Sequence, residues 1–313
     1  MEYNRLGDSG CVVSRVGLGT NNFGFRIDPE ASREVLDAAL DAGVTLIDTS
    51  DSYGDAEVVL GDALVGRRDE VVLATKFGSE LHRDDAGPDW GARGSRRYIR
   101  AAVERSLRRL QTDWIDLYQL HRPDPLTPIA ETLGALEELV AEGKVRYLGC
   151  SNFTGWQIAD AAWTARIRGT QGFISAQNHW NLLERGIETE VVPAAEHFGL
   201  GILPYFPLAS GVLTGKYRRG EDPPSDSRLV AWRRQDTLTD DVFAATESLD
   251  AFAQTRGITL LDVAMGWLAS RPGVASVIAG ATRPEQVTAN VAAARWSPTD
   301  DDVVEIDRIT HGD

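Results

Sequence analysis

Cysteine and long apolar runs are scarce in this sequence. Its 313 residues include two cysteines, Cys11 and Cys150, which are too few for a disulfide framework. No stretch approaches the ~20 apolar residues that span a bilayer, and the opening segment MEYNRLGDSG lacks the apolar core of a secretory signal. We therefore expect a cytoplasmic protein without a membrane segment, in which both cysteines are small core residues.

Lysine is also rare, and positive charge is in deficit. Three of the 32 basic residues are lysines, at positions 76, 144 and 216, so a lysine here is less easily explained as an arbitrary surface cation. The net charge of -15 repels polyanions, which argues against non-specific binding to nucleic acid or to an anionic membrane. A small anionic ligand in a local positive pocket remains compatible with this charge.

The apolar pattern alternates between strand-like runs and helical periodicity in a sequence that is 42% hydrophobic. Strands are expected at 16–19, 44–48, 71–76, 114–120, 145–150, 174–177, 200–205 and 274–278. Helices are expected at 30–42, 56–65, 95–110, 128–142, 156–167, 187–198, 259–270 and 284–294. Alternating strands and helices predict a parallel sheet, and eight repeats predict a (β/α)8 TIM barrel as a single domain over residues 1–313.

Four segments lie outside these repeats. Residues 2–15 resemble a hairpin, residues 78–95 form a Gly- and Asp-rich loop, residues 218–234 form a polar loop, and residues 297–309 predict a short final helix. A doubly wound open sheet is the alternative fold. It is disfavoured because no G-x-G-x-x-G follows the first strand.

Four titratable residues stand at or just beyond consecutive strand ends: Asp48, Tyr53, Lys76 and His121. Barrel enzymes build their active sites at the C-terminal ends of the strands. Taken singly, the aspartate could cap a helix, the tyrosine could be a rim aromatic and the histidine could bond within a turn. A lysine at the end of a buried strand is harder to explain by such a structural role. The four residues together indicate acid–base chemistry.

The combination of side chains suits the reduction of a carbonyl group. A phenol has a pKa near 10 and is a weak acid, but a nearby ammonium stabilises the phenolate and lowers that pKa. The carboxylate balances the ammonium, and the imidazole can orient the carbonyl. Because no protein side chain donates hydride, a nicotinamide cofactor is required, and no metal ion is expected.

Eight blocks of the sequence resemble the aldo-keto reductase family, in the family's order and over nearly the whole chain: GLGT, IDTSDSYG, LATKFG, YQLHRPDP, VRYLGCSNF, SAQNHWN, PYFPLASGVLTGKY and VIAGATRPEQVTAN. The short C-terminal end is similar to the bacterial and channel-β-subunit branch. The resemblance implies that Tyr53 is the general acid, that Lys76 and Asp48 tune it, and that His121 positions the carbonyl.

The resemblance also implies NADP(H) as cofactor, with NAD(H) as the alternative. The nicotinamide end is assigned to Gly19, Thr20, Ser151, Asn152, Gln177 and Tyr205, of which the tyrosine stacks on the ring. The pyrophosphate is assigned to Leu208, Gly211, Leu213 and Lys216, although the lysine reads equally well as a solvated rim cation. The adenosine phosphate is assigned to Gly280, Thr282, Gln286 and Asn290.

Substrate-wall candidates are polar or aromatic residues that could equally belong to the core: Asn22, Phe23, Phe25, Phe77, Trp90, Trp180 and Trp232. They suit an apolar or sugar-like carbonyl compound. Two segments depart from the family pattern. The loop after Tyr53, YGDAEVVLG, is shorter than usual and should reshape one wall of the pocket, and Arg283 is the one full cation in the adenosine segment.

Three function classes fit these residues. The first is reduction of an aldehyde, ketone or keto-sugar, and the second is a sugar or polyol dehydrogenase that runs oxidatively. The third is a non-catalytic module that binds the cofactor for regulation, as potassium-channel β-subunits illustrate. The complete tetrad favours an enzyme over the module.

Overall fold

The computed structural model describes residues 1–80 and 90–311. Eight parallel strands form one sheet in the order β10-β3-β4-β5-β6-β7-β8-β9. Their bounds are β3 (Val16–Gly19), β4 (Leu46–Asp48), β5 (Val72–Phe77), β6 (Ile115–Leu120), β7 (Val145–Ser151), β8 (Phe173–Gln177), β9 (Gly201–Ile202) and β10 (Val277–Gly280). Parallel bridges from Ile202 to Val274 and from Tyr205 to Ile278 join the last two strand segments. The sheet therefore closes, and the predicted TIM barrel is confirmed.

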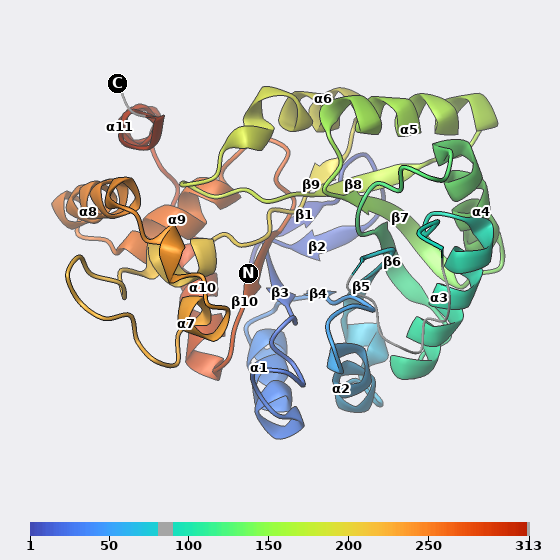
Figure 1. Cartoon of the computed structure of the whole chain (residues 1–313), viewed down its shortest axis with the longest axis horizontal. Coiled ribbons are helices and arrows are strands. Elements are labelled where there is room, and N and C mark those ends of the chain that lie inside the picture. Colours follow the sequence, from blue (N-terminus) through green and yellow to red (C-terminus); the bar gives the residue numbers. More distant parts are fainter. Residues whose placement is uncertain (81–89, 312–313) are drawn as a thin grey trace.

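Helices surround the sheet as an outer ring (Figure 1). The repeat helices are α1 (Pro29–Asp41), α2 (Ala56–Ala63), α3 (Arg96–Arg109), α4 (Ile129–Ala141), α5 (Gly155–Arg168), α6 (Val191–Phe198), α9 (Leu260–Ala269) and α10 (Pro284–Ala293). Some of these helices begin with a side-chain cap: Asp28 accepts a hydrogen bond from the Ala31 amide at the start of α1, and Ser95 caps α3. The main hydrophobic core lies between these helices and the outer face of the barrel.

Some boundaries differ from the sequence-based expectation. The seventh strand was expected over 200–205, but β9 spans two residues, because Pro204 has no N–H to donate and interrupts the ladder. The eighth was expected over 274–278 and instead reaches Gly280. The sixth helix is preceded by a separate 3-10 turn, Gly186–Thr189.

The C-terminal third contains three further helices. The short α7 (Arg228–Ala231) lies within the expected polar loop, and α11 (Asp300–His311) is the expected final helix. The helix α8 (Asp240–Thr255) was not expected, although Thr239 caps it and it buries Leu249 and Phe252. It packs against α9, and α11 packs against α8, outside the barrel repeats.

The predicted N-terminal hairpin, β1 (Tyr3–Arg5) and β2 (Val12–Ser14), closes one end of the barrel. In Figure 1 its strands lie within the ring of helices. Its apolar side chains join a cluster with inward-facing strand residues, namely Leu6, Cys11, Val13, Leu46, Ala74, Leu117, Ile174, Leu203, Ala275 and Ile278. The plugged end leaves the opposite mouth, where the strands end, as the place for a site.

Both cysteines are buried and unpaired, as expected. Within the described ranges, none of the helices combines the length and the apolarity needed to cross a membrane. Residues 81–89 of the loop expected at 78–95 lie outside the described residues.

Candidate active site

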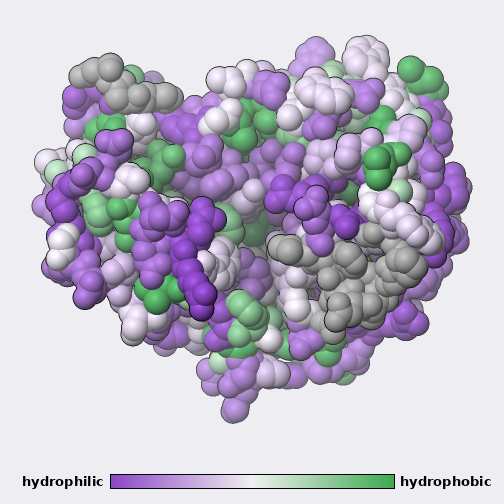
Figure 2. Space-filling view, in the orientation of Figure 1, coloured by the Kyte–Doolittle hydropathy of each residue, from purple (hydrophilic) through white to green (hydrophobic). Residues whose placement is uncertain are grey.

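The barrel brings the four titratable residues together at its C-terminal mouth. Asp48 is the last residue of β4, Lys76 lies near the end of the adjacent β5, and His121 directly follows β6. Tyr53 lies in the loop between β4 and α2, whose turn is closed by a bond from its amide to the Ser50 carbonyl. The molecular surface is hollowed near the middle of the face that Figure 2 shows.

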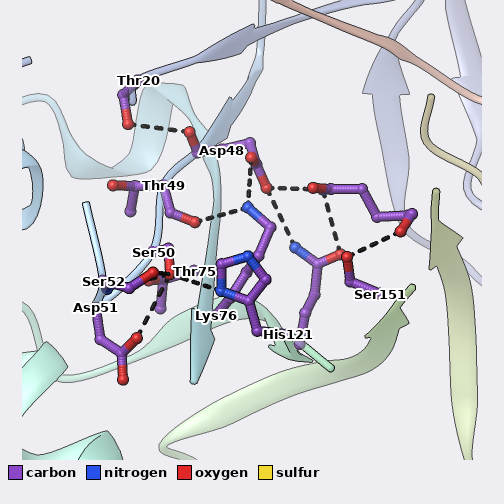
Figure 3. Close-up of polar contacts among 12 residues, drawn as sticks. Thr20, Asp48, Thr49, Ser50, Asp51, Ser52, Thr75, Lys76, His121 and Ser151 are labelled. Atoms are coloured by element: carbon purple, nitrogen blue, oxygen red, sulfur yellow. Dashed lines mark hydrogen bonds and ion pairs between the residues drawn. The ribbon is translucent and has the colours of Figure 1, made fainter. Parts of the chain in front are cut away.

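Lys76 and Asp48 form a buried ion pair at the base of this site (Figure 3). The lysine Nζ lies 2.6 Å from Asp48 Oδ2 and donates a second bond, 2.9 Å long, to the Thr49 carbonyl. The two side chains are 0% and 4% exposed. Burial works to lower the pKa of Lys76, but the charges of Asp48 and Tyr53 and the hydrogen bonds to them together outweigh it, so the pKa is raised and the ammonium form is kept.

The second oxygen of Asp48 accepts two amide bonds. Gln119 Nε2 lies 3.2 Å and Gln177 Nε2 lies 2.9 Å from Asp48 Oδ1. The resemblance assigned Gln177 to the nicotinamide end, and its amide also holds the carboxylate. The sequence-based prediction did not include Gln119. Its position two residues before His121 could have indicated it, because alternate residues of a strand share one face.

Tyr53 lies between the lysine and the histidine. The Lys76 Nζ is 5.1 Å from the centroid of the phenol ring, and the His121 ring meets that ring edge-on at 5.9 Å. Burial raises the pKa of Tyr53 above its usual value near 10, and the charge of Lys76 opposes this without reversing it. Lys76 therefore acts on the phenol in the expected direction, but burial is the larger effect and the net shift of the Tyr53 pKa is upward.

His121 is held by two contacts on opposite parts of the residue. Its Nδ1 lies 3.1 Å from Ser50 Oγ, and its backbone carbonyl accepts a 2.9 Å bond from Asn152 Nδ2. Burial, with the charges of Lys76 and Arg122, lowers the pKa of His121 to about 3. The imidazole is therefore neutral across the physiological range, and it can donate a hydrogen bond without carrying charge.

We expect His121 to remain neutral from pH 5 to pH 8, whereas histidine in model peptides titrates near pH 6.5. The reason is that protonation would place a second cation beside Lys76 in a half-buried site. An NMR titration of the ring protons, with His121 assigned by the signal missing from His121→Gln, measures this. A titration midpoint of His121 at or above pH 6 would contradict the assignment.

The residues assigned to the nicotinamide end lie around the same mouth. Thr20 Oγ1 donates to the Asp48 carbonyl at 3.0 Å, and Ser151 Oγ donates to the Gln177 carbonyl at 2.8 Å. Asn152 has a positive φ of 59°, a conformation that non-glycine residues rarely adopt and that often marks a functional site. Its Oδ1 accepts a 2.8 Å bond from the Tyr205 hydroxyl.

The segment assigned to the pyrophosphate has an irregular backbone. Positive φ angles occur at Phe206, Ala209, Ser210, Gly211 and Gly215. Turns of this kind orient successive amides toward one point and are typical of anion-binding loops. A Cβ at position 211 would lie 2.7 Å from the Nζ of Lys216, so a larger residue there would displace that lysine.

Arg228 is a further basic residue at this end, and the sequence analysis did not single it out. Its Nη2 lies 3.1 Å from Asn22 Oδ1 and 3.3 Å from Asn21 Oδ1. Burial, together with Arg26, lowers the pKa of its guanidinium to about 10. In residues 1–80 and 90–311 no carboxylate forms an ion pair with it, and its guanidinium lies over the rings of Phe206 and Trp232, at 5.5 and 5.0 Å from their centroids. A half-buried cation of this kind is suited to bind an anion. Because arginine is common throughout this chain, the residue type alone does not indicate a function for Arg228.

The adenosine segment continues from this basic region. Gly280 ends β10, and a Cβ added there would lie 3.3 Å from the Arg228 guanidinium. Gln286 Oε1 accepts a 2.8 Å bond from the Thr282 amide, and Asn290 is buried on α10.

Leu208 adjoins the core and Leu213 is fully buried in it. Gly19 pairs with Gly280 across the barrel sheet, which brings both ends of the assigned cofactor region onto neighbouring strands.

Three of the proposed substrate-wall aromatics are core residues. Phe23 and Phe77 are 0% exposed, and Trp180 is 2% exposed, with its Nε1 bonded to Glu188 and its ring against Trp267. For these three residues the structure favours the core alternative, because their rings pack in the main hydrophobic cluster.

For the other candidates the wall assignment stays a prediction. Phe25 is 70% exposed and Trp90 is 73% exposed, with the Arg97 guanidinium 4.7 Å over its ring. Trp232 packs edge-on against Phe206. Asn22 is buried and donates to the Ala281 carbonyl, so it supports the mouth from beneath.

Comparison with known proteins agrees with this geometry. Residues 15–311 match the model of the aldo/keto reductase family. The chain is 36% identical to the Bacillus subtilis protein named aldo-keto reductase YhdN, over 99% of this chain and 93% of that one. It is 37% identical to the uncharacterized oxidoreductase YrpG of the same bacterium, and 36% identical to a probable voltage-gated potassium channel subunit beta of Arabidopsis thaliana. Each of these two alignments covers 95% of this chain and 92% of the relative. The chain therefore belongs to the aldo/keto reductase family of oxidoreductases.

Proposed function

We propose that this protein is an NADPH-dependent carbonyl reductase that converts an aldehyde, ketone or keto-sugar to the alcohol. The observation that carries the proposal is the buried Lys76–Asp48 pair, which lies beneath a protonated phenol and beside a neutral imidazole. The nicotinamide cofactor supplies the hydride when it is bound.

Each residue of the tetrad has a distinct part in the proton transfer. Tyr53 donates its proton to the carbonyl oxygen as the alcohol forms, and its raised pKa keeps the phenol protonated beforehand. Lys76 stabilises the phenolate that results, and Asp48 keeps the ammonium in place. His121 orients the carbonyl by a hydrogen bond from its uncharged ring.

The residues around the mouth fit nicotinamide adenine dinucleotide phosphate, NADP(H). Ser151, Asn152 and Tyr205 would hold the nicotinamide end, and the positive-φ turn with Arg228 would hold the pyrophosphate. Arg283, the N-cap residue of α10, is the cation that would pair with a 2′-phosphate. The fit rests on the half-buried guanidinium of Arg228, whose charge no described carboxylate balances.

We predict that NADPH binds more tightly than NADH, because Arg283 can pair with the extra phosphate. Arg283→Ala should weaken NADPH binding about tenfold, the size of one charge-assisted hydrogen bond, and should leave NADH binding unchanged. Arg228→Met is the matched variant and should weaken both cofactors alike, since the pyrophosphate is common to them. Titrating both cofactors by quenching of tryptophan fluorescence measures these affinities.

Two results would contradict this assignment of the cofactor site. One is equal affinity of the wild-type protein for NADPH and NADH. The other is a loss of affinity in Arg283→Ala that is the same for both cofactors. This result would mean that Arg283 does not bind the 2′-phosphate.

Two alternatives share the same scaffold. A sugar or polyol dehydrogenase would use the tetrad in reverse, and a non-catalytic cofactor-binding module is suggested by the name of the Arabidopsis relative, a probable potassium channel subunit beta. Following NADPH absorbance with a panel of aldehydes, ketones and keto-sugars, and NADP⁺ with the alcohols, separates them. Cofactor binding without turnover on any compound would favour the module.

A further inference from the structure

The hydroxyl of Ser50 lies between the catalytic histidine and a second buried carboxyl group. Its Oγ is 3.1 Å from His121 Nδ1 on one side and 3.4 Å from Asp51 Oδ1 on the other. Ser50 is 1% exposed and Asp51 is 6% exposed. In Figure 3 the histidine and the aspartate approach the serine from different directions. Neither Ser50 nor Asp51 has a part in the tetrad, so the chain of contacts needs its own explanation.

The number of protons allows two directions for the Ser50–His121 bond, while the Ser52 hydroxyl, 2.9 Å from Ser50 Oγ, can donate to Ser50 or accept from it. Ser50 carries one hydroxyl proton, and the neutral ring of His121 carries one N–H. If Ser50 donates to Nδ1, the ring proton lies on Nε2. If Nδ1 donates to Ser50, then Nε2 has a lone pair and cannot give a hydrogen bond to a carbonyl oxygen. The direction of a single bond therefore decides whether the imidazole can orient a carbonyl substrate.

We propose that Ser50 is a positioning residue that donates its proton to Nδ1 of His121 and so keeps the Nε2–H form of the ring. The inference rests on the proposed function, because it gives that N–H the substrate carbonyl as its acceptor. The serine acts through the histidine and touches neither substrate nor cofactor. Its hydroxyl also accepts a 3.2 Å bond from the Ser52 amide, which fixes the lone-pair side of the oxygen.

Asp51 competes for the same proton in a way that depends on its own charge. Burial and the charge of Glu57 raise the pKa of Asp51 to about 7. The other groups that face it are Arg105 and Arg109 from α3, which oppose the rise, and the Tyr118 hydroxyl from β6. A protonated Asp51 donates to Ser50 and leaves the serine proton to the histidine. An ionised Asp51 accepts that proton instead.

The position of the ring proton can be measured directly. Two-bond ¹H–¹⁵N correlation spectra of the ¹⁵N-labelled protein at pH 6 should show His121 with the proton on Nε2, with the signal assigned by its absence from His121→Gln. In Ser50→Ala we expect this preference to be lost, and Ser50→Thr should restore it. A wild-type spectrum with the proton on Nδ1 would overturn the inference without recourse to any variant.

The kinetic test uses a matched pair of serines. Ser50→Ala should lower kcat for carbonyl reduction by about fivefold to tenfold, the size of one neutral hydrogen bond, with little change in KM. Ser248→Ala removes an exposed hydroxyl on α8, which donates to the Ala244 carbonyl of its own helix, and should leave kcat unchanged. Equal losses in the two variants, or no loss in Ser50→Ala, would refute the positioning role.

The pH profile supplies a readout that a merely structural serine would not move. The wild-type kcat should fall as pH rises through about 7, the pKa of Asp51. Asp51→Asn, whose amide can donate to Ser50 at every pH, should lack this fall. A fall that persists in Asp51→Asn would refute the competition. Absence of any carbonyl turnover would refute the proposed function instead, since the spectrum of His121 is read without turnover.

Discussion

Replacing Tyr53 by phenylalanine is expected to lower kcat for carbonyl reduction by about 10²- to 10⁴-fold, the usual contribution of a positioned general acid. Phenylalanine keeps the ring between Lys76 and His121 but removes the phenol proton that passes to the carbonyl oxygen. The measurement is the rate of NADPH oxidation, followed by absorbance, with the best substrate found in the panel.

Cofactor affinity and stability should change little in this variant, because the ring remains packed against the core. Tyr3→Phe is the matched control: it removes a tyrosine hydroxyl from the opposite end of the barrel, where the Tyr3 hydroxyl bonds to the Gly43 carbonyl. We expect it to retain full turnover. Equal rates for the wild-type and Tyr53→Phe proteins would rule out the tyrosine as proton donor.

Replacing Lys76 by methionine is expected to abolish turnover and to lower the free energy of unfolding by about 3–5 kcal/mol, the usual effect of breaking a buried pair. Methionine fills similar space, but it leaves Asp48 at 4% exposure without its counter-charge. It also removes the cation that stabilises the phenolate of Tyr53. Urea unfolding and the NADPH assay measure the two effects.

A second variant separates stability from catalysis. When Lys76→Met is combined with Asp48→Asn, the uncompensated charge is gone, while the side-chain oxygen of the new amide can still accept the bonds of Gln119 and Gln177. We expect this double variant to recover part of the lost stability and none of the turnover. Recovered turnover would show that the lysine acts only through the fold, and unchanged stability in Lys76→Met would refute the buried pair.

The meeting of four titratable residues at one mouth could be predicted from the sequence because two simple rules place them. Alternating strands and helices predict a barrel, and parallel strands in a barrel end at one mouth. Asp48, Lys76 and His121 stand at three successive strand ends, so their convergence follows from topology without any knowledge of side-chain contacts.

The residues that were missed or misplaced depend on packing between distant segments. Gln119 supports Asp48 across 71 positions, and Arg228 reaches Asn22 across 206, so local pattern gives no sign of either contact. Phe23 and Trp180 looked like wall aromatics, but aromatic rings fill a core or line a pocket equally well until their neighbours are known.

The sequence by itself determined the fold class, the family and the four tetrad positions, because strand periodicity and strand ends are local features. The tertiary structure decided the state of those groups. It buries Tyr53 and thereby raises its pKa, holds His121 neutral, and places Ser50 between His121 and Asp51. The physical reason is that solvation and charge–charge distance set protonation, and both come from contacts between β4, β5, β6 and their loops rather than from residue order.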